Sequence, residues 1–70
     1  MLPLNFADLN QEVVIQKVGG SPEIRQHLAD LGFVPGGAVT VITSLGGNLI
    51  IKVKESRVAL NEELARKIMV

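Results

Sequence analysis

Apolar residues recur along the chain with two different periods, one typical of a helix and one typical of strands. Ile24, Leu28 and Leu31 follow the i, i+4, i+7 spacing of a single helix face. Over residues 38–43 and 49–54 apolar side chains fall instead mainly on alternate positions, the pattern of a strand with one buried face. These two periods predict a mainly β chain with one helix inserted early.

The helix is predicted from about residue 21 to about residue 31. Ser21 is a good N-cap, and Pro22 suits the first helical position. Gly32 can adopt the left-handed conformation that ends a helix, and Pro35-Gly36 fits the centre of a type II turn. Together these features define a structural signature, which consists of Leu28, Leu31, Gly32, Pro35 and Gly36.

Five short strands are predicted around this helix, over residues 12–18, 38–43, 49–54, 57–60 and 68–70. Leu45-Gly46-Gly47-Asn48 supplies a hairpin loop and Glu55-Ser56 a second tight connection. A short helical turn is predicted over about 61–67, capped by Asn61. The last strand is expected to pair with the first, and Leu4, Phe6 or Leu9 to cover one end of the core. Hairpin-linked strands favour a small antiparallel β-barrel, predicted as one domain over residues 1–70.

Composition limits how such a domain can be stabilised. The chain has 70 residues, no cysteine and a hydrophobic fraction of 47%. Disulfides and zinc–thiolate sites are therefore excluded, and aliphatic burial must supply the stability. A body this small cannot bury every Val, Ile and Leu. The sequence leaves open whether the exposed ones form a patch for a partner, or another copy of the chain, or are scattered.

Charge and hydropathy narrow the classes of partner. Seven basic and seven acidic residues are interspersed, without the basic block that nucleic-acid binding requires. No apolar run approaches the ~20 residues that span a bilayer, so membrane insertion is not expected. The first residues have no basic n-region and no cleavage site of a signal peptide. A cytoplasmic location follows as the expectation.

The residues offer little for catalysis. There is one histidine, and the three serines fall at expected caps or turns, so no nucleophilic triad is expected and the protein is predicted not to be an enzyme. Gly19-Gly20 lacks the lysine and the glycine spacing of nucleotide-binding loops, and it is interpreted as a turn before a helix cap. The absence of Tyr and Trp argues against a polyproline-binding groove.

Glu23, His27 and Asp30 are the candidate metal ligands. They lie at i, i+4 and i+7 on one face of the predicted helix, and imidazole with carboxylate suits divalent metals such as ferrous iron. Charged residues beside an apolar stripe are equally typical of a solvated helix face. We therefore expect no resident cofactor and at most weak divalent-metal binding.

The stretch Leu28-Ala29-Asp30-Leu31-Gly32-Phe33-Val34-Pro35-Gly36, followed by Val39-Thr40-Val41, resembles the core signature of the FeoA family. The resemblance extends over almost the whole chain, including Arg57-Val58-Ala59-Leu60 and the ending with Ala65, Ile68 and Val70. Asn10 departs from the glycine that the family often has, but asparagine tolerates the same left-handed geometry.

The resemblance implies an SH3-like β-barrel with an inserted helix, acting on ferrous iron uptake at the membrane. It also implies a partner, the cytoplasmic part of an FeoB-type transporter, to which GTP hydrolysis belongs. The alternative is a divalent-metal-responsive module similar to the C-terminal SH3-like domain of iron-dependent repressors. Aliphatic side chains beside glycines indicate the candidate docking residues, which are Val34, Leu45, Gly46, Gly47 and Leu49.

Overall fold

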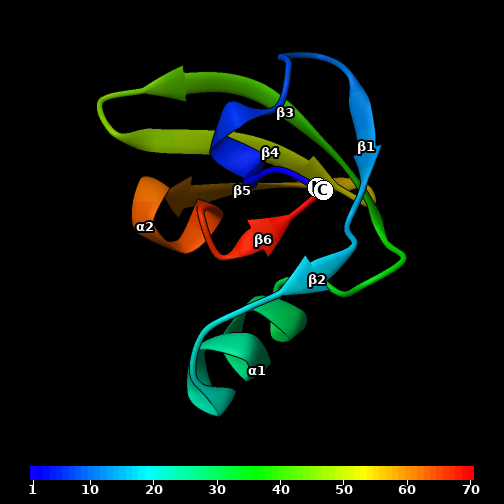
Figure 1. The fold of residues 1–70 in the computed structure, drawn as a ribbon. Helices are drawn as coiled ribbons and strands as arrows, with labels where there is room; N and C mark the ends of the chain where they lie inside the picture. Colours follow the sequence, from blue (N-terminus) through cyan, green and yellow to red (C-terminus); the bar gives the residue numbers. More distant parts are fainter.

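The computed structural model describes residues 1–70, in which short strands surround one hydrophobic core. In chain order the elements are η1 (Leu4–Phe6), β1 (Glu12–Val14), β2 (Lys17–Val18), α1 (Pro22–Asp30), β3 (Ala38–Leu45), β4 (Asn48–Val53), β5 (Ser56–Asn61), α2 (Glu62–Ala65) and β6 (Ile68–Met69). The strands form two antiparallel sheets, a four-stranded one in the order β1-β3-β4-β5 and a two-stranded one of β2 and β6. Figure 1 shows α1 at the bottom of the molecule and the β3–β4 hairpin well away from it at the upper left.

The first predicted strand divides into two strands that belong to different sheets. β1 pairs with β3, whereas β2 pairs with β6. Between them, the Ile15 N–H donates to the Gly37 carbonyl at 2.9 Å and the Gln16 N–H donates to the Met69 carbonyl at 2.7 Å. The Ile15 side chain is buried in the core. The chain thus turns a corner here, and the predicted pairing of the last strand with the first is confirmed for the second half, β2.

The hairpins follow from the turn residues. Gly46 and Gly47 have φ values of 59° and 82°, as a two-residue type I′ turn between β3 and β4 requires. The turn between β4 and β5 consists of Lys54 and Glu55, with Lys54 at φ 55°. The prediction of Glu55-Ser56 for this turn is wrong by one residue, because Ser56 already pairs with Val53.

The core consists of apolar side chains from every part of the chain. Its buried members are Leu4, Ile15, Leu28, Phe33, Val39, Val41, Leu49, Ile51, Val53, Leu60, Ala65 and Ile68. In the leading segment Leu4 covers the core, whereas Phe6 and Leu9 remain 70% and 53% exposed. Neither helix is long and apolar enough to cross a membrane.

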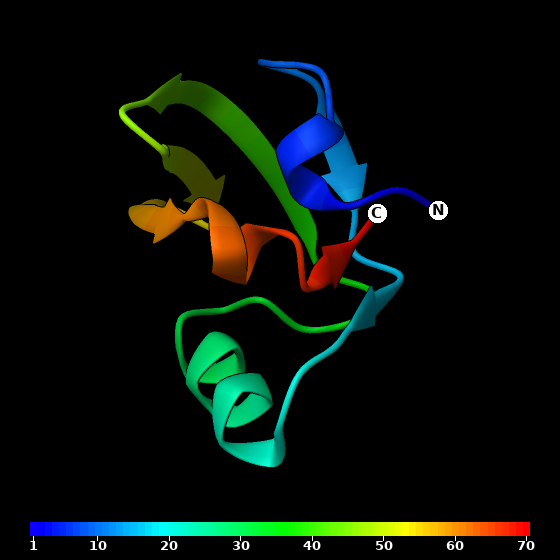
Figure 2. The same cartoon turned by 60° about the vertical axis from the view of Figure 1, so that its left-hand side comes forward.

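The two ends of the chain lie side by side (Figures 1 and 2). The Leu2 N–H donates to the Val70 carbonyl at 2.9 Å, and the Val70 N–H donates to the Leu2 carbonyl at 2.8 Å. Pro3 forms an antiparallel bridge with Met69 next to them. The first residues therefore extend the small sheet along the side of β6 that β2 leaves free.

Candidate functional site

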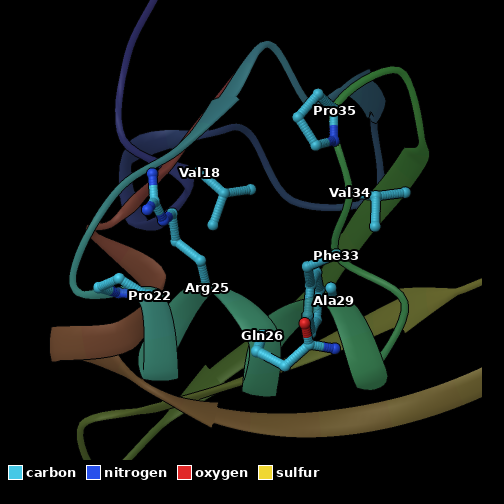
Figure 3. A pocket seen from close by; sticks show the side chains of 8 residues that line it. All are labelled: Val18, Pro22, Arg25, Gln26, Ala29, Phe33, Val34 and Pro35. Carbon is cyan, nitrogen blue, oxygen red and sulfur yellow. The ribbon is translucent and has the colours of Figure 1, made fainter.

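One groove of about 380 Å³ opens on the surface between α1, β2 and the segment that follows α1. We call it the α1 groove. Its lining residues are Val18, Pro22, Arg25, Gln26, Ala29, Phe33, Val34 and Pro35. Figure 3 shows Pro22 and Arg25 toward one end of the groove and Val34 and Pro35 toward the other, with Val18 between them.

Helix α1 forms one wall of the groove, because one of its faces packs against the core and a neighbouring face borders the groove. Leu28 is fully buried, and Ile24 and Leu31 pack against the core beside it. Positions 22, 25, 26 and 29 follow the i, i+3, i+4, i+7 spacing of a neighbouring helix face, and this second face lines the groove. The helix begins where the Ser21 side chain accepts a hydrogen bond from the Ile24 N–H at 3.3 Å. The predicted helix and its cap are confirmed.

The opposite wall depends on how α1 ends. Gly32 adopts φ 105°, and the Phe33 N–H donates to the Leu28 carbonyl at 2.9 Å. The Gly32 N–H donates to the Ala29 carbonyl at 2.9 Å, so the two bonds form a Schellman motif. This motif returns the Phe33 ring to the core, where it forms the floor of the groove.

A type II turn then fixes Val34 and Pro35. The Gly37 N–H donates to the Val34 carbonyl at 3.0 Å, and Gly36 between them has φ 87°. The Gly36 N–H also donates to the Ile15 carbonyl at 2.8 Å. Backbone hydrogen bonds therefore hold this wall against the corner between β1 and β2, and the groove is preformed rather than assembled by a ligand.

The lining chemistry suits binding rather than catalysis. Arg25 is the only charged residue of the groove, and the single ion pair of the protein joins Arg66 and Glu62 elsewhere. An arginine stays protonated, so the groove contains no general acid, general base or nucleophile. An apolar side chain with an anionic or polar group beside it would match the apolar walls and the Arg25 guanidinium.

The predicted docking residues fall in two separate places. Val34 is 39% exposed and lines the α1 groove. Leu45 is 75% exposed at the β3–β4 hairpin, which lies well away from α1 in both views (Figures 1 and 2). The Gly47 carbonyl accepts a hydrogen bond from the Glu62 N–H at 3.0 Å, so the hairpin is tied to the start of α2.

Leu49 corrects the prediction for this loop. Its side chain is only 3% exposed and belongs to the core, so it is not available to a partner. The reason is the alternation of β4, which begins at Asn48, one residue earlier than predicted, and directs Leu49, Ile51 and Val53 inward.

The candidate metal ligands lie on an exposed face of α1. Glu23, His27 and Asp30 are all exposed, and the Asp30 carboxylate accepts a hydrogen bond from the Gln26 side-chain amide at 2.9 Å. No group of three or more His, Asp or Glu side chains in the structure is arranged to hold a metal ion. The structure therefore does not bring these three residues together, although all three share the helix.

Sequence reasoning missed Arg25, Gln26 and Ala29 as lining residues. The sequence pattern distinguished a buried apolar stripe and a charged face on the helix. It gave no indication that a third face lines the α1 groove. The small side chain of Ala29 at a half-buried position is the one local signal, because a larger residue there would fill the groove.

Comparisons with known proteins agree with this architecture. The family model of the FeoA domain matches residues 2–70. A Methanocaldococcus jannaschii protein named Fe(2+) transport protein A is 37% identical over 70 residues, which is 100% of this chain and 85% of that protein.

Two solved structures superpose over nearly the whole chain. The crystal structure of an iron uptake regulatory protein, FeoA, has a TM-score of 0.91 and 28% identity, covering 99% of this chain and 93% of that one. The Stenotrophomonas maltophilia FeoA, described as a prokaryotic SH3 domain protein in complex with zinc, has a TM-score of 0.86 and 26% identity. That match covers 100% of this chain and 89% of that one. The predicted SH3-like fold is confirmed.

Proposed function

The chain belongs to the FeoA family, and from this premise we propose that it is an accessory and regulatory protein of ferrous iron uptake. It acts by binding the cytoplasmic part of an FeoB-type transporter, and it is itself located in the cytoplasm. The family is associated with ferrous iron transport. The observation that carries the proposal is the match of the family model to residues 2–70.

The α1 groove is the docking surface of this proposal. It is concave, its walls are held by backbone hydrogen bonds, and it contains no group that could perform proton transfer. A preformed apolar hollow limits the ordering cost that binding incurs, and an apolar anchor from a partner would fill it. Arg25 at its rim would orient a carboxylate of the same partner.

A matched pair of variants tests the docking surface. Val34→Asp places a charge on the groove wall, and Leu45→Asp makes the same chemical change at the hairpin. We expect Val34→Asp to weaken binding to the purified cytoplasmic part of the transporter at least tenfold, and Leu45→Asp to leave it unchanged. Calorimetry measures both affinities, and thermal unfolding confirms that both variants are folded. If only Leu45→Asp weakens binding, the hairpin is the docking surface.

A separate experiment tests the function itself. Deleting the gene in its host should lower the rate of ferrous iron uptake, and expression of the intact protein should restore it. Normal uptake in the deletion strain, together with no binding to the transporter, would refute the proposed function.

A divalent-metal-responsive module is the second candidate function. The observation that favours it is the zinc complex of the S. maltophilia relative. Glu23 and His27, one helical turn apart on α1, would contribute to such a site. Calorimetric titration with ferrous and zinc ions distinguishes the two functions, because the adaptor needs no metal affinity. A His27→Ala variant that binds either metal as tightly as the unmodified protein would remove His27 from the site.

A further inference from the structure

Strand β5 ends the four-stranded sheet and has a strand neighbour on one side only, β4. The Glu62 N–H donates to the Gly47 carbonyl just beyond the last pair of the β4–β5 ladder, Asn48 and Asn61. That last pair is therefore a non-hydrogen-bonded pair, and the next pair, Leu49 and Leu60, is a hydrogen-bonded one. Hydrogen-bonded and non-hydrogen-bonded pairs alternate in antiparallel sheets, so the backbone groups of Ser56, Val58 and Leu60 face β4.

The backbone N–H and C=O groups of Arg57 and Ala59 consequently point to the free side of β5. None of the backbone hydrogen bonds outside the helices and strands uses these groups, and β5 has no strand neighbour other than β4. Both residues are exposed. An open strand edge of this kind can accept an added strand.

The charged side chains on the strands at this edge are both positive, whereas Glu55 lies in the turn before β5 and Glu62 and Glu63 follow its last residue. Arg57 lies directly opposite Lys52 in β4, in a non-hydrogen-bonded pair, where cross-strand side chains approach closest. Lys52 and Arg57 are the only charged residues of β3, β4 and β5, which contain no Asp or Glu. In the same register row, Glu12 of β1 lies beyond Thr40 of β3, two strands away from Lys52.

Neither cation has a partner of opposite charge, since the one ion pair of the protein joins Glu62 of α2 to Arg66 just after it. Like charges placed opposite each other on neighbouring strands repel. A carboxylate brought to the edge beside Arg57 would relieve this repulsion, and a guanidinium can bind a carboxylate through two hydrogen bonds.

We propose that the free edge of β5 binds an extended segment of a protein partner, in which acidic and apolar residues alternate. Its carboxylates lie on the face of Arg57 and Lys52, and its apolar side chains continue the inner face formed by Val58 and Leu60. The inference deepens the proposed function, on which it rests, by naming the chemistry of a segment in the partner. This edge shares no residue with the α1 groove, whose lining residues all precede β3.

Other occupants fit the charges less well. A second copy of the chain paired through β5 would bring its own Arg57 to the edge and add positive charge to positive charge. Anionic membranes are bound by clusters of about four to eight basic residues, and specific DNA binding uses a comparable number of phosphate contacts. Two cations at one edge suit one or two carboxylates of a peptide.

The probe is an acetylated and amidated heptapeptide in which glutamate alternates with valine between terminal threonines. The full-length, isotope-labelled protein is titrated with it, and amide hydrogen exchange is followed by NMR. We expect exchange at Arg57 and Ala59 to slow at least tenfold at saturation, because their N–H groups enter a new ladder. Exchange at Ser56 and Val58, whose groups already bond to β4, should hardly change.

Two controls make the charge argument specific. The same peptide with lysine in place of glutamate should bind at least fivefold more weakly. Arg57→Glu should weaken the glutamate peptide about fivefold, from typical cross-strand charge-pair energies, and should improve binding of the lysine peptide. Lys17→Glu, at an exposed position of the other sheet, should change neither affinity.

Several outcomes would overturn the inference. These are unchanged exchange at Arg57 and Ala59, equal affinity for both peptides, protection confined to the α1 groove, or concentration-dependent pairing of two copies through β5. The inference would also be overturned if the protein bound phosphatidylserine vesicles in a way that requires Arg57, while the peptide gave no protection of β5 amides from exchange.

Binding of the transporter separates this inference from the proposed function. If the transporter's cytoplasmic part binds the unmodified chain and the Arg57→Glu variant equally, the inference fails and the proposed function stands. If the peptide protects β5 while the transporter does not bind at all, the edge site stands and the proposed partner is wrong.

Discussion

Replacing Gly32 by alanine should destabilise the protein more than the same change at Gly36. Both glycines have positive φ, 105° at Gly32 and 87° at Gly36, so either alanine carries about 1–2 kcal/mol of backbone strain. A Cβ at Gly32 would also lie 3.0 Å from Cγ2 of Val53, whereas nothing lies within 4 Å of one at Gly36. Val53 is buried in the core and cannot move freely, so this contact adds about 1–3 kcal/mol.

The comparison cancels the effect of alanine on the unfolded chain, because both variants share it. With about 4–8 °C lost per kcal/mol in a chain of this size, Gly32→Ala should unfold roughly 5–20 °C below Gly36→Ala. Thermal and urea unfolding followed by circular dichroism measure the difference. Equal losses in the two variants would refute the reasoning, because they would mean that the Val53 contact imposes no cost.

Three further stability predictions follow from burial and capping. Leu28→Ala removes a fully buried side chain of α1 and should cost about 3–5 kcal/mol in urea unfolding, unless the site collapses around the cavity. Leu45→Asp, at the exposed hairpin, should shift the unfolding temperature by no more than a few degrees, and a large loss would show that Leu45 packs on the body. Asn61→Ala removes the side-chain acceptor 2.8 Å from the Leu64 N–H and should cost about 1 kcal/mol, whereas Asn61→Ser should retain most of that stability in the same assay.

The sequence predicted elements whose signals are local. Ser21 and Asn61 cap the helices as expected, and Gly46-Gly47 forms the predicted hairpin turn. The division of the first strand could not be predicted, because it depends on β6 pairing with Lys17 and Val18 from the far end of the chain. A pairing between residues so far apart in the sequence cannot be predicted from the pattern of neighbouring residues.

The turn at Lys54 shows a second limit. A lysine at φ 55° adopts a left-handed conformation that costs free energy for any residue except glycine. Lysine is therefore not a residue from which this turn could be predicted. The register of β4 against β5, with Val53 opposite Ser56, overrides this local preference.

The candidate site was predictable only in part. Val34 was identified by its exposed aliphatic side chain next to a turn, and it lines the groove. Arg25 was not identified, because the sequence pattern of a charged residue on a short helix does not differ between a position that faces only solvent and one that lines a groove. The free edge of β5 likewise follows only from the strand order, which the residues of β5 do not encode by themselves.

The pairing of Leu2 with Val70 has a thermodynamic consequence of its own. Because two backbone hydrogen bonds hold the chain ends together, a short peptide linker could join them into a ring without distorting either strand. Closing the chain would remove conformations from the unfolded state only, and the loop-entropy relation gives a gain on the order of 4 kcal/mol for a ring of 70 residues. Cyclisation therefore offers a way to stabilise this small domain while leaving the α1 groove and the β5 edge unchanged.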